Sequence, residues 1–121
     1  LIDLGKWWNG RTPNWPMPLG GNVVRRDLGE DVMRDITKYT KMSIEHALKS
    51  PDEALEFAKA WGRGIDDDTN KEFVGMYVND RTIDYKEDGR AAIRLFIKEG
   101  QHIGMIRNDF DTATMRFIGE P

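Results

Sequence analysis

The fold class is decided by a stretch that reads PMPLGGNVVRR, residues 16–26 of a 121-residue chain. Its prolines exclude a regular helix, because proline fixes φ and restricts the residue before it. The paired valines that follow favour a strand at Asn22–Arg26, since β-branched residues pack well on a pleated sheet. Leu1–Leu4 is a second short, apolar, strand-like segment. Two short strands beside a mainly helical remainder predict an α/β protein.

Downstream of this stretch, the sequence marks the starts of about four helices. The strongest signal is Ser50-Pro51-Asp52-Glu53, where a capping serine is followed by proline at the first helical position and by an acidic residue. The helix that it opens is expected to stop at Gly62-Arg63-Gly64. The other three helices are expected to begin near Asp27, Thr69 and Asp84.

The composition excludes several classes of protein. Lys and Arg number 18 against 21 Asp and Glu, so the net charge of −3 lacks the basic footprint of a nucleic-acid-binding protein. There is no cysteine, which excludes disulfides and thiolate metal sites and fits a reducing compartment. No apolar run reaches the roughly 18 residues of a membrane-spanning helix. We therefore expect a cytoplasmic protein that binds neither nucleic acid nor membrane.

The residues themselves give no catalytic or metal-binding set. His46 and His102 are too far apart in the sequence to form a metal motif. Asp66-Asp67-Asp68 lacks the frame of a calcium loop, so we expect it to place charge at the start of the next helix. Tryptophans around the proline-rich loop could line a ligand cleft or pack beneath the loop; they are Trp7, Trp8 and Trp15. We predict no cofactor, no metal and no catalytic residue in this chain.

Several segments resemble one enzyme family. Residues 16–29, together with Asp3-Leu4-Gly5 and Trp7-Trp8, are similar to the 1,4-dihydroxy-6-naphthoate synthases of the futalosine route to menaquinone. The similarity continues through Pro51–Leu55 and covers about Leu1–Phe96. It implies a lyase-type synthase that converts cyclic dehypoxanthine futalosine, a small-molecule substrate, to 1,4-dihydroxy-6-naphthoate.

The same resemblance implies a two-lobed fold like that of type II periplasmic binding proteins, with this chain as a carboxy-terminal fragment. Residues 1–21 would end the second lobe and return to the first, residues 22–104 would form the helical part of the first lobe, and residues 105–121 would be a tail with a possible strand. The family's histidine base precedes the segment that matches Leu1, so this chain would not contain it. The strands would need partners from the missing half of the chain or from another copy.

The candidate substrate-binding residues end the proline-rich segment and are Leu19, Gly20, Gly21 and Asn22. Prolines stiffen the approach to this loop, and glycine lets a ligand come close to backbone N–H groups. Alternatively, the two glycines serve only a tight turn before the strand.

Three interpretations of the parent protein stay open. It is the menaquinone-biosynthesis enzyme or a solute-binding protein with the same fold and no catalysis, and a helical interaction domain is a distant third.

Overall fold

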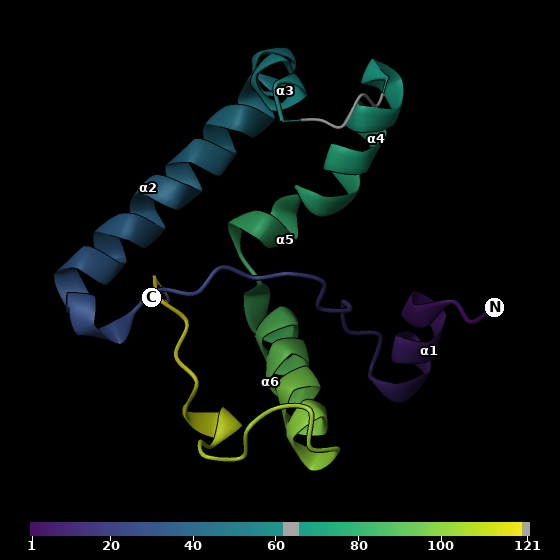
Figure 1. The fold of residues 1–121 in the computed structure, drawn as a ribbon, viewed down its shortest axis with the longest axis vertical. Coiled ribbons are helices and arrows are strands. Elements are labelled where there is room, and N and C mark those ends of the chain that lie inside the picture. Colours follow the sequence, from purple (N-terminus) through teal and green to yellow (C-terminus); the bar gives the residue numbers. More distant parts are fainter. Residues whose placement is uncertain (62–65, 120–121) are drawn as a thin grey trace. The chain divides into compact units, whose positions relative to one another are not determined.

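The computed structural model describes residues 1–61 and 66–119, and every regular element assigned in those residues is a helix. Figure 1 labels the α-helices. The α-helices are α1 (Leu4–Arg11), α2 (Glu30–Lys49), α3 (Pro51–Lys59), α4 (Asp67–Tyr77), α5 (Asp80–Ile83) and α6 (Lys86–His102). Two short 3-10 helices accompany them, η1 (Arg26–Leu28) and η2 (Thr112–Thr114). Contacts group the chain into unit 1, which comprises Leu1–Arg25 and Tyr85–Pro121, and unit 2, which comprises Arg26–Asp84.

The predicted α/β class, and with it the predicted pair of short strands, is wrong, because the described residues contain no strand. Leu1–Leu4 leads directly into α1, and Asn22–Arg26 is irregular until η1 begins. Val23 is 98% exposed. β-branched residues favour a strand only where a neighbouring strand and a packed face receive them, and the described residues supply neither to Val23. The possible strand in the tail, residues 105–121, is absent too, because the regular element assigned in its described part is η2.

The predicted helix starts are close to the observed ones. Helices α2, α4 and α6 begin within three residues of the predicted positions. Pro51 occupies the first turn of α3 as predicted, but the Ser50 side chain makes no capping hydrogen bond. Gly29, rather than Asp27, caps α2 with φ of 81°, a backbone region in which glycine has no steric penalty. The predicted helix stop at Gly62-Arg63-Gly64 lies outside the described residues.

Helix α5 was not predicted, and a reciprocal cap accounts for it. The Asn79 side-chain oxygen accepts a hydrogen bond from the Arg81 N–H at 2.9 Å, and the Thr82 hydroxyl accepts one from the Asn79 N–H at 3.1 Å. These two bonds satisfy backbone donors that a helix start leaves without partners. The result is a separate short helix between α4 and α6 in the sequence.

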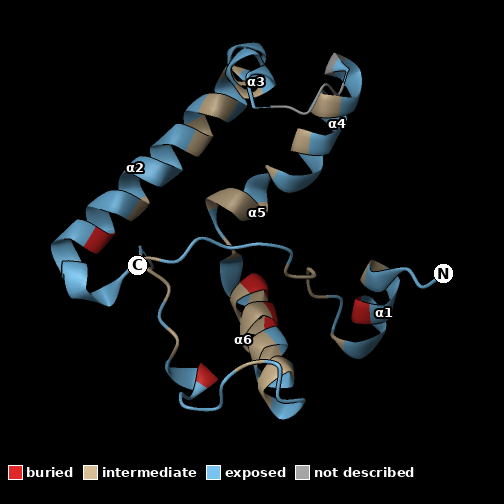
Figure 2. Ribbon diagram, in the orientation of Figure 1, coloured by how far each residue is buried: buried red, intermediate tan, exposed pale blue. Residues whose placement is uncertain are grey.

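Trp8 organises the core of unit 1. Its side chain is 2% exposed, and its ring meets Phe96 of α6 edge-on with 5.9 Å between ring centroids. Its indole N–H donates a hydrogen bond to the Pro16 carbonyl oxygen at 3.2 Å. Buried residues of unit 1 also lie on α6 and at η2 (Figure 2). Trp8 thus ties α1, the proline-rich loop and α6 together, and for this tryptophan the packing alternative is confirmed.

The tail that follows α6 folds back onto that helix. Arg94 donates a hydrogen bond from Nη2 to the Met115 carbonyl oxygen at 3.2 Å, and its guanidinium lies 5.0 Å from the centroid of the Phe117 ring. Phe117 also meets Tyr85 edge-on, with 6.0 Å between centroids. Thr112 of η2 is buried. The described part of the tail is therefore a packed part of unit 1.

Unit 2 has a much smaller core. Helix α2 contacts η1, α3 and α5, and Met33 on α2 is the only buried residue among those described in this unit. Several other large apolar side chains of α2, between Val32 and Leu48, are 40–62% exposed. None of the helices in the described part of the chain combines the length and the hydropathy needed to cross a membrane.

Asp66 caps α4 and gives its first turn a pH dependence. The carboxylate accepts a hydrogen bond from the Thr69 N–H at 3.0 Å, and this bond lowers the pKa of Asp66 below its ordinary value. The contribution to helix stability is therefore present above the unfolded-state pKa of about 4 and is lost as the pH falls through the lower, folded-state pKa. The expected charge at this helix start is confirmed for Asp66.

We expect Asp66→Ala to fray the first turn of α4 at neutral pH, because the cap is lost. Asp66→Asn should keep the cap, since asparagine is an equally good capping residue, and should remove the acid sensitivity. The Thr69 amide resonance, followed by NMR between pH 6 and pH 2, reports both effects. A titration of Thr69 that persists in Asp66→Asn would contradict the assignment.

Candidate functional site

The structure places the four predicted substrate-binding residues on one exposed, irregular segment of unit 1. Leu19 is 68% exposed, and Gly20, Gly21 and Asn22 are exposed as well. A Cβ added to Gly20 would meet no atom within 4 Å, and one added to Gly21 would lie 3.5 Å from the Tyr85 hydroxyl. The segment is open to a ligand from solvent along its backbone.

Neither Gly20 nor Gly21 has a positive φ that would require glycine at its position. Positive φ among the described glycines occurs at Gly29, Gly104 and Gly119, and so at neither Gly20 nor Gly21. The alternative explanation for the glycine pair is a tight turn before a strand, and no strand follows it in the described residues. The lack of a side chain at Gly20 and Gly21 therefore leaves open space beside the backbone.

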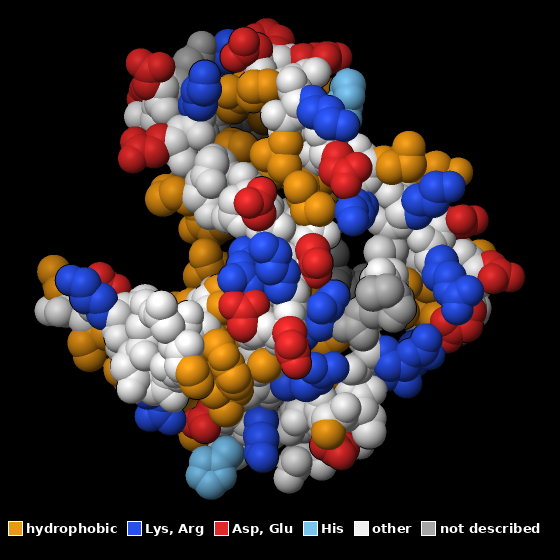
Figure 3. Space-filling model, turned by 180° about the vertical axis from the view of Figure 1, so that it is seen from behind, with side chains coloured by type: hydrophobic (Ala, Val, Ile, Leu, Met, Phe, Trp, Pro, Cys, Tyr) orange, Lys and Arg blue, Asp and Glu red, His pale blue; other side chains and the backbone are white. Residues whose placement is uncertain are grey.

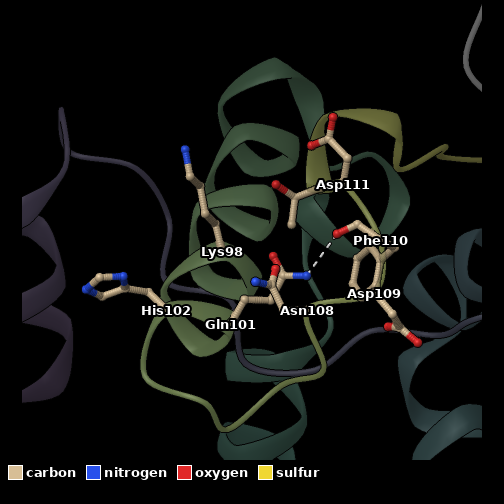
Figure 4. Close-up of a pocket in the computed structure, with 8 residues that line it drawn as sticks. Lys98, Gln101, His102, Asn108, Asp109, Phe110 and Asp111 are labelled. Atoms are coloured by element: carbon tan, nitrogen blue, oxygen red, sulfur yellow. Dashed lines mark hydrogen bonds between the residues drawn. The ribbon is translucent and has the colours of Figure 1, made fainter.

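An open hollow of about 620 Å³ lies between the end of α6 and the loop that follows it (Figure 4). Its lining residues are Lys98, Gln101, His102, Asn108, Asp109, Phe110, Asp111 and Thr112. Gln101 holds the loop in place, because its Nε2 donates hydrogen bonds to the carbonyl oxygens of Arg107 at 3.1 Å and Phe110 at 3.0 Å. The predicted candidates Leu19–Asn22 do not line this hollow.

The acidic groups of this hollow have structural partners. Asp109 pairs with Arg107, and the Asp111 carboxylate accepts a hydrogen bond from the Ala113 N–H at 2.9 Å at the start of η2. His102 points away from the loop residues in Figure 4, so neither Asp109 nor Asp111 orients it as a base. Asp109 and Asp111 thus shape the loop, and neither is paired with His102 for proton transfer.

The other predicted candidates are dispersed. Trp15 lines a second open hollow of about 500 Å³ at the start of α6, together with Lys86, Glu87, Asp88 and Ala91. His46 is exposed on α2, with its Nε2 3.9 Å from a carboxylate oxygen of Glu53. Across the described ranges, no three His, Asp or Glu side chains are grouped as a metal site would require.

Two residues with a clear role in unit 1 were not singled out from the sequence. Tyr85 stands between Gly21 and Phe117, and Gln101 fixes the loop after α6. No local pattern signals either residue, because each acts on a segment remote in the sequence or on backbone carbonyls. Only knowledge of how the tail packs on α6 could have identified them.

Comparison with known proteins points to one family. Residues 1–102 match the model of a family described as menaquinone biosynthesis. A Thermus thermophilus protein named 1,4-dihydroxy-6-naphtoate synthase is 35% identical over 105 residues, which are 87% of this chain and 38% of that protein. A Streptomyces coelicolor protein of the same name is 29% identical over 106 residues, 88% of this chain and 37% of that protein. The chain thus spans less than two fifths of these relatives, and no solved structure matches it.

Proposed function

Because the chain belongs to the menaquinone biosynthesis family, we propose that it forms part of an enzyme that converts cyclic dehypoxanthine futalosine to 1,4-dihydroxy-6-naphthoate. The observation that carries the proposal is the family match over residues 1–102, supported by two relatives named for this product. The reaction would be a lyase-type step in the cytoplasm. The solute-binding alternative has no comparable support, since neither relative is named for transport or solute binding.

Within that enzyme, we assign Leu19–Asn22 to substrate contact. The segment is exposed, and the loop that leads to it is fixed at its base by the hydrogen bond from the Trp8 indole to the Pro16 carbonyl. A loop held in this way loses little conformational entropy when it binds a ligand. The base that the reaction requires would come from a part of the enzyme outside this chain.

A chimaera tests the proposed function. The 105 matching residues of the Thermus thermophilus relative are replaced by the corresponding residues of this chain, and formation of 1,4-dihydroxy-6-naphthoate from cyclic dehypoxanthine futalosine is measured. We expect turnover by the chimaera and none by the isolated 121-residue chain, because a general base must come within hydrogen-bond reach of its proton.

The unchanged relative is the positive control, and thermal unfolding establishes that the chimaera is folded. A folded chimaera that forms no product would contradict the proposed reaction. Turnover by the isolated chain would contradict the assignment of the base to another part of the enzyme.

A further inference from the structure

Helix α2 carries an apolar stripe that the described residues leave exposed. Val32, Ile36 and Tyr39, named here the α2 stripe, are 46%, 41% and 62% exposed. Their spacing of four and then three residues places them on one side of the helix. Figure 3 likewise shows many hydrophobic side chains at the surface. A continuous apolar side on an amphipathic helix is normally covered by another part of a protein.

The buried side of α2 is a different one. Met33, which is 4% exposed, follows Val32 by one residue and so lies about 100° around the helix from it. The contacts of α2 within unit 2 therefore leave the α2 stripe available. Covering the stripe would remove apolar area from water, which stabilises by about 25 cal/mol for each Å² buried.

Two threonine hydroxyls on α2 would not oppose burial of the stripe. The Thr40 hydroxyl already donates a hydrogen bond to the Ile36 carbonyl oxygen at 2.8 Å, and the Thr37 hydroxyl donates one to the Met33 carbonyl oxygen at 2.9 Å. A hydroxyl that keeps such a partner has little desolvation cost when water is excluded. Charged groups border the α2 stripe. The Lys38 ammonium lies 5.7 Å from the centroid of the Tyr39 ring. Asp35 follows Val32 by three residues and so lies beside it on the helix. The stripe therefore suits a protein surface that is apolar at its centre and polar at its edge.

The length of the relatives indicates what covers the stripe. Helix α2 lies wholly inside residues 1–102, the range that the family model matches. The Thermus thermophilus relative shares only 38% of its length with this chain, so roughly three fifths of its polypeptide has no counterpart here. We propose that the α2 stripe is the docking face for that remaining part of the family's polypeptide. The inference rests on family membership and not on the proposed reaction.

Co-expression tests the proposal. The part of the Thermus thermophilus relative outside the matched 105 residues is produced as a tagged polypeptide together with this 121-residue chain. We expect the two to purify as a one-to-one complex. Ile36→Ser and Tyr39→Ser should each weaken the complex at least tenfold in a titration, because each removes apolar area from the stripe.

Leu48→Ser is the matched control. Leu48 is 40% exposed, close to the 41% of Ile36, but it lies on another side of α2. It should leave the affinity within twofold, and circular dichroism of each variant alone should show the same helix content. Absence of a complex, or equal effects of Ile36→Ser and Leu48→Ser, would overturn the proposal. So would a dimer of the chain alone that Ile36→Ser dissociates, because a second copy would then be the occupant.

Discussion

Trp8→Ala should remove about 3–5 kcal/mol from the stability of unit 1, the usual loss when a buried tryptophan is truncated. The substitution empties the space against Phe96 and leaves the Pro16 carbonyl without its indole donor. A small domain has only about 5–15 kcal/mol in total, so the packing of α1 against α6 should be largely lost. Urea unfolding, followed by circular dichroism and by amide exchange in α6, measures the effect.

Trp7→Ala is the matched control, because Trp7 is the adjacent residue of the same helix and is 46% exposed. Its ring is covered on one face by Arg11, at 5.2 Å from the guanidinium carbon to the ring centroid, and its removal should cost only about 1 kcal/mol. Trp8→Phe should fall between the two variants, since it keeps an aromatic ring but not the hydrogen bond. Equal losses for Trp7→Ala and Trp8→Ala would contradict the central place of Trp8.

Gly21→Val, introduced into the active chimaera, should lower kcat/KM by about 30-fold, which corresponds to about 2 kcal/mol. The reason is steric: the isopropyl group would stand where the substrate approaches the backbone of Leu19–Asn22. The fold should tolerate the change, because a Cβ at Gly21 lies at an ordinary contact distance from the Tyr85 hydroxyl and its φ is not positive. Steady-state kinetics and a thermal unfolding curve of the same preparation separate binding from stability.

Gly20→Val, which meets no atom within 4 Å in this chain, should have a similar kinetic effect. Gly10→Val serves as the control, since Gly10 in α1 has equally open surroundings but lies outside the candidate segment. Wild-type kinetics in well-folded Gly20→Val and Gly21→Val chimaeras would remove the segment from the site. A loss of thermal stability with unchanged kinetics would favour a purely structural role.

The helices could be predicted because their signals are local. Pro51 fixes the first turn of α3 through its own backbone, and Asp66 reaches the Thr69 N–H only three residues away. Such contacts form whatever the rest of the chain does. The cap at Asn79 was missed although it is local, because threonine rather than an acidic residue completes it.

The strands could not be predicted in the same way, because a strand exists only through its neighbours. Val23 and Val24 have the residue type of a strand, yet Val23 is almost fully exposed and no strand lies beside it in the described residues. The candidate segment Leu19–Asn22 could be located from the sequence through its prolines and glycines. Its proximity to Tyr85 could not, because the 63 residues between Gly21 and Tyr85 carry no signal that the two positions lie close together.

Three of the hydrogen bonds that hold the tail on α6 do not depend on the tail's own side chains. Arg94 and Gln101 donate their hydrogen bonds to carbonyl oxygens of the main chain, at Arg107, Phe110 and Met115. Every amino acid, proline included, offers that acceptor. Substitutions at Arg107, Phe110 and Met115 can therefore keep these three acceptors, whereas a substitution of Arg94 or Gln101 removes the donors on α6. Two side chains on one helix thus supply attachments that do not depend on the tail's sequence, beside the sequence-dependent contacts of Asp111 and Phe117.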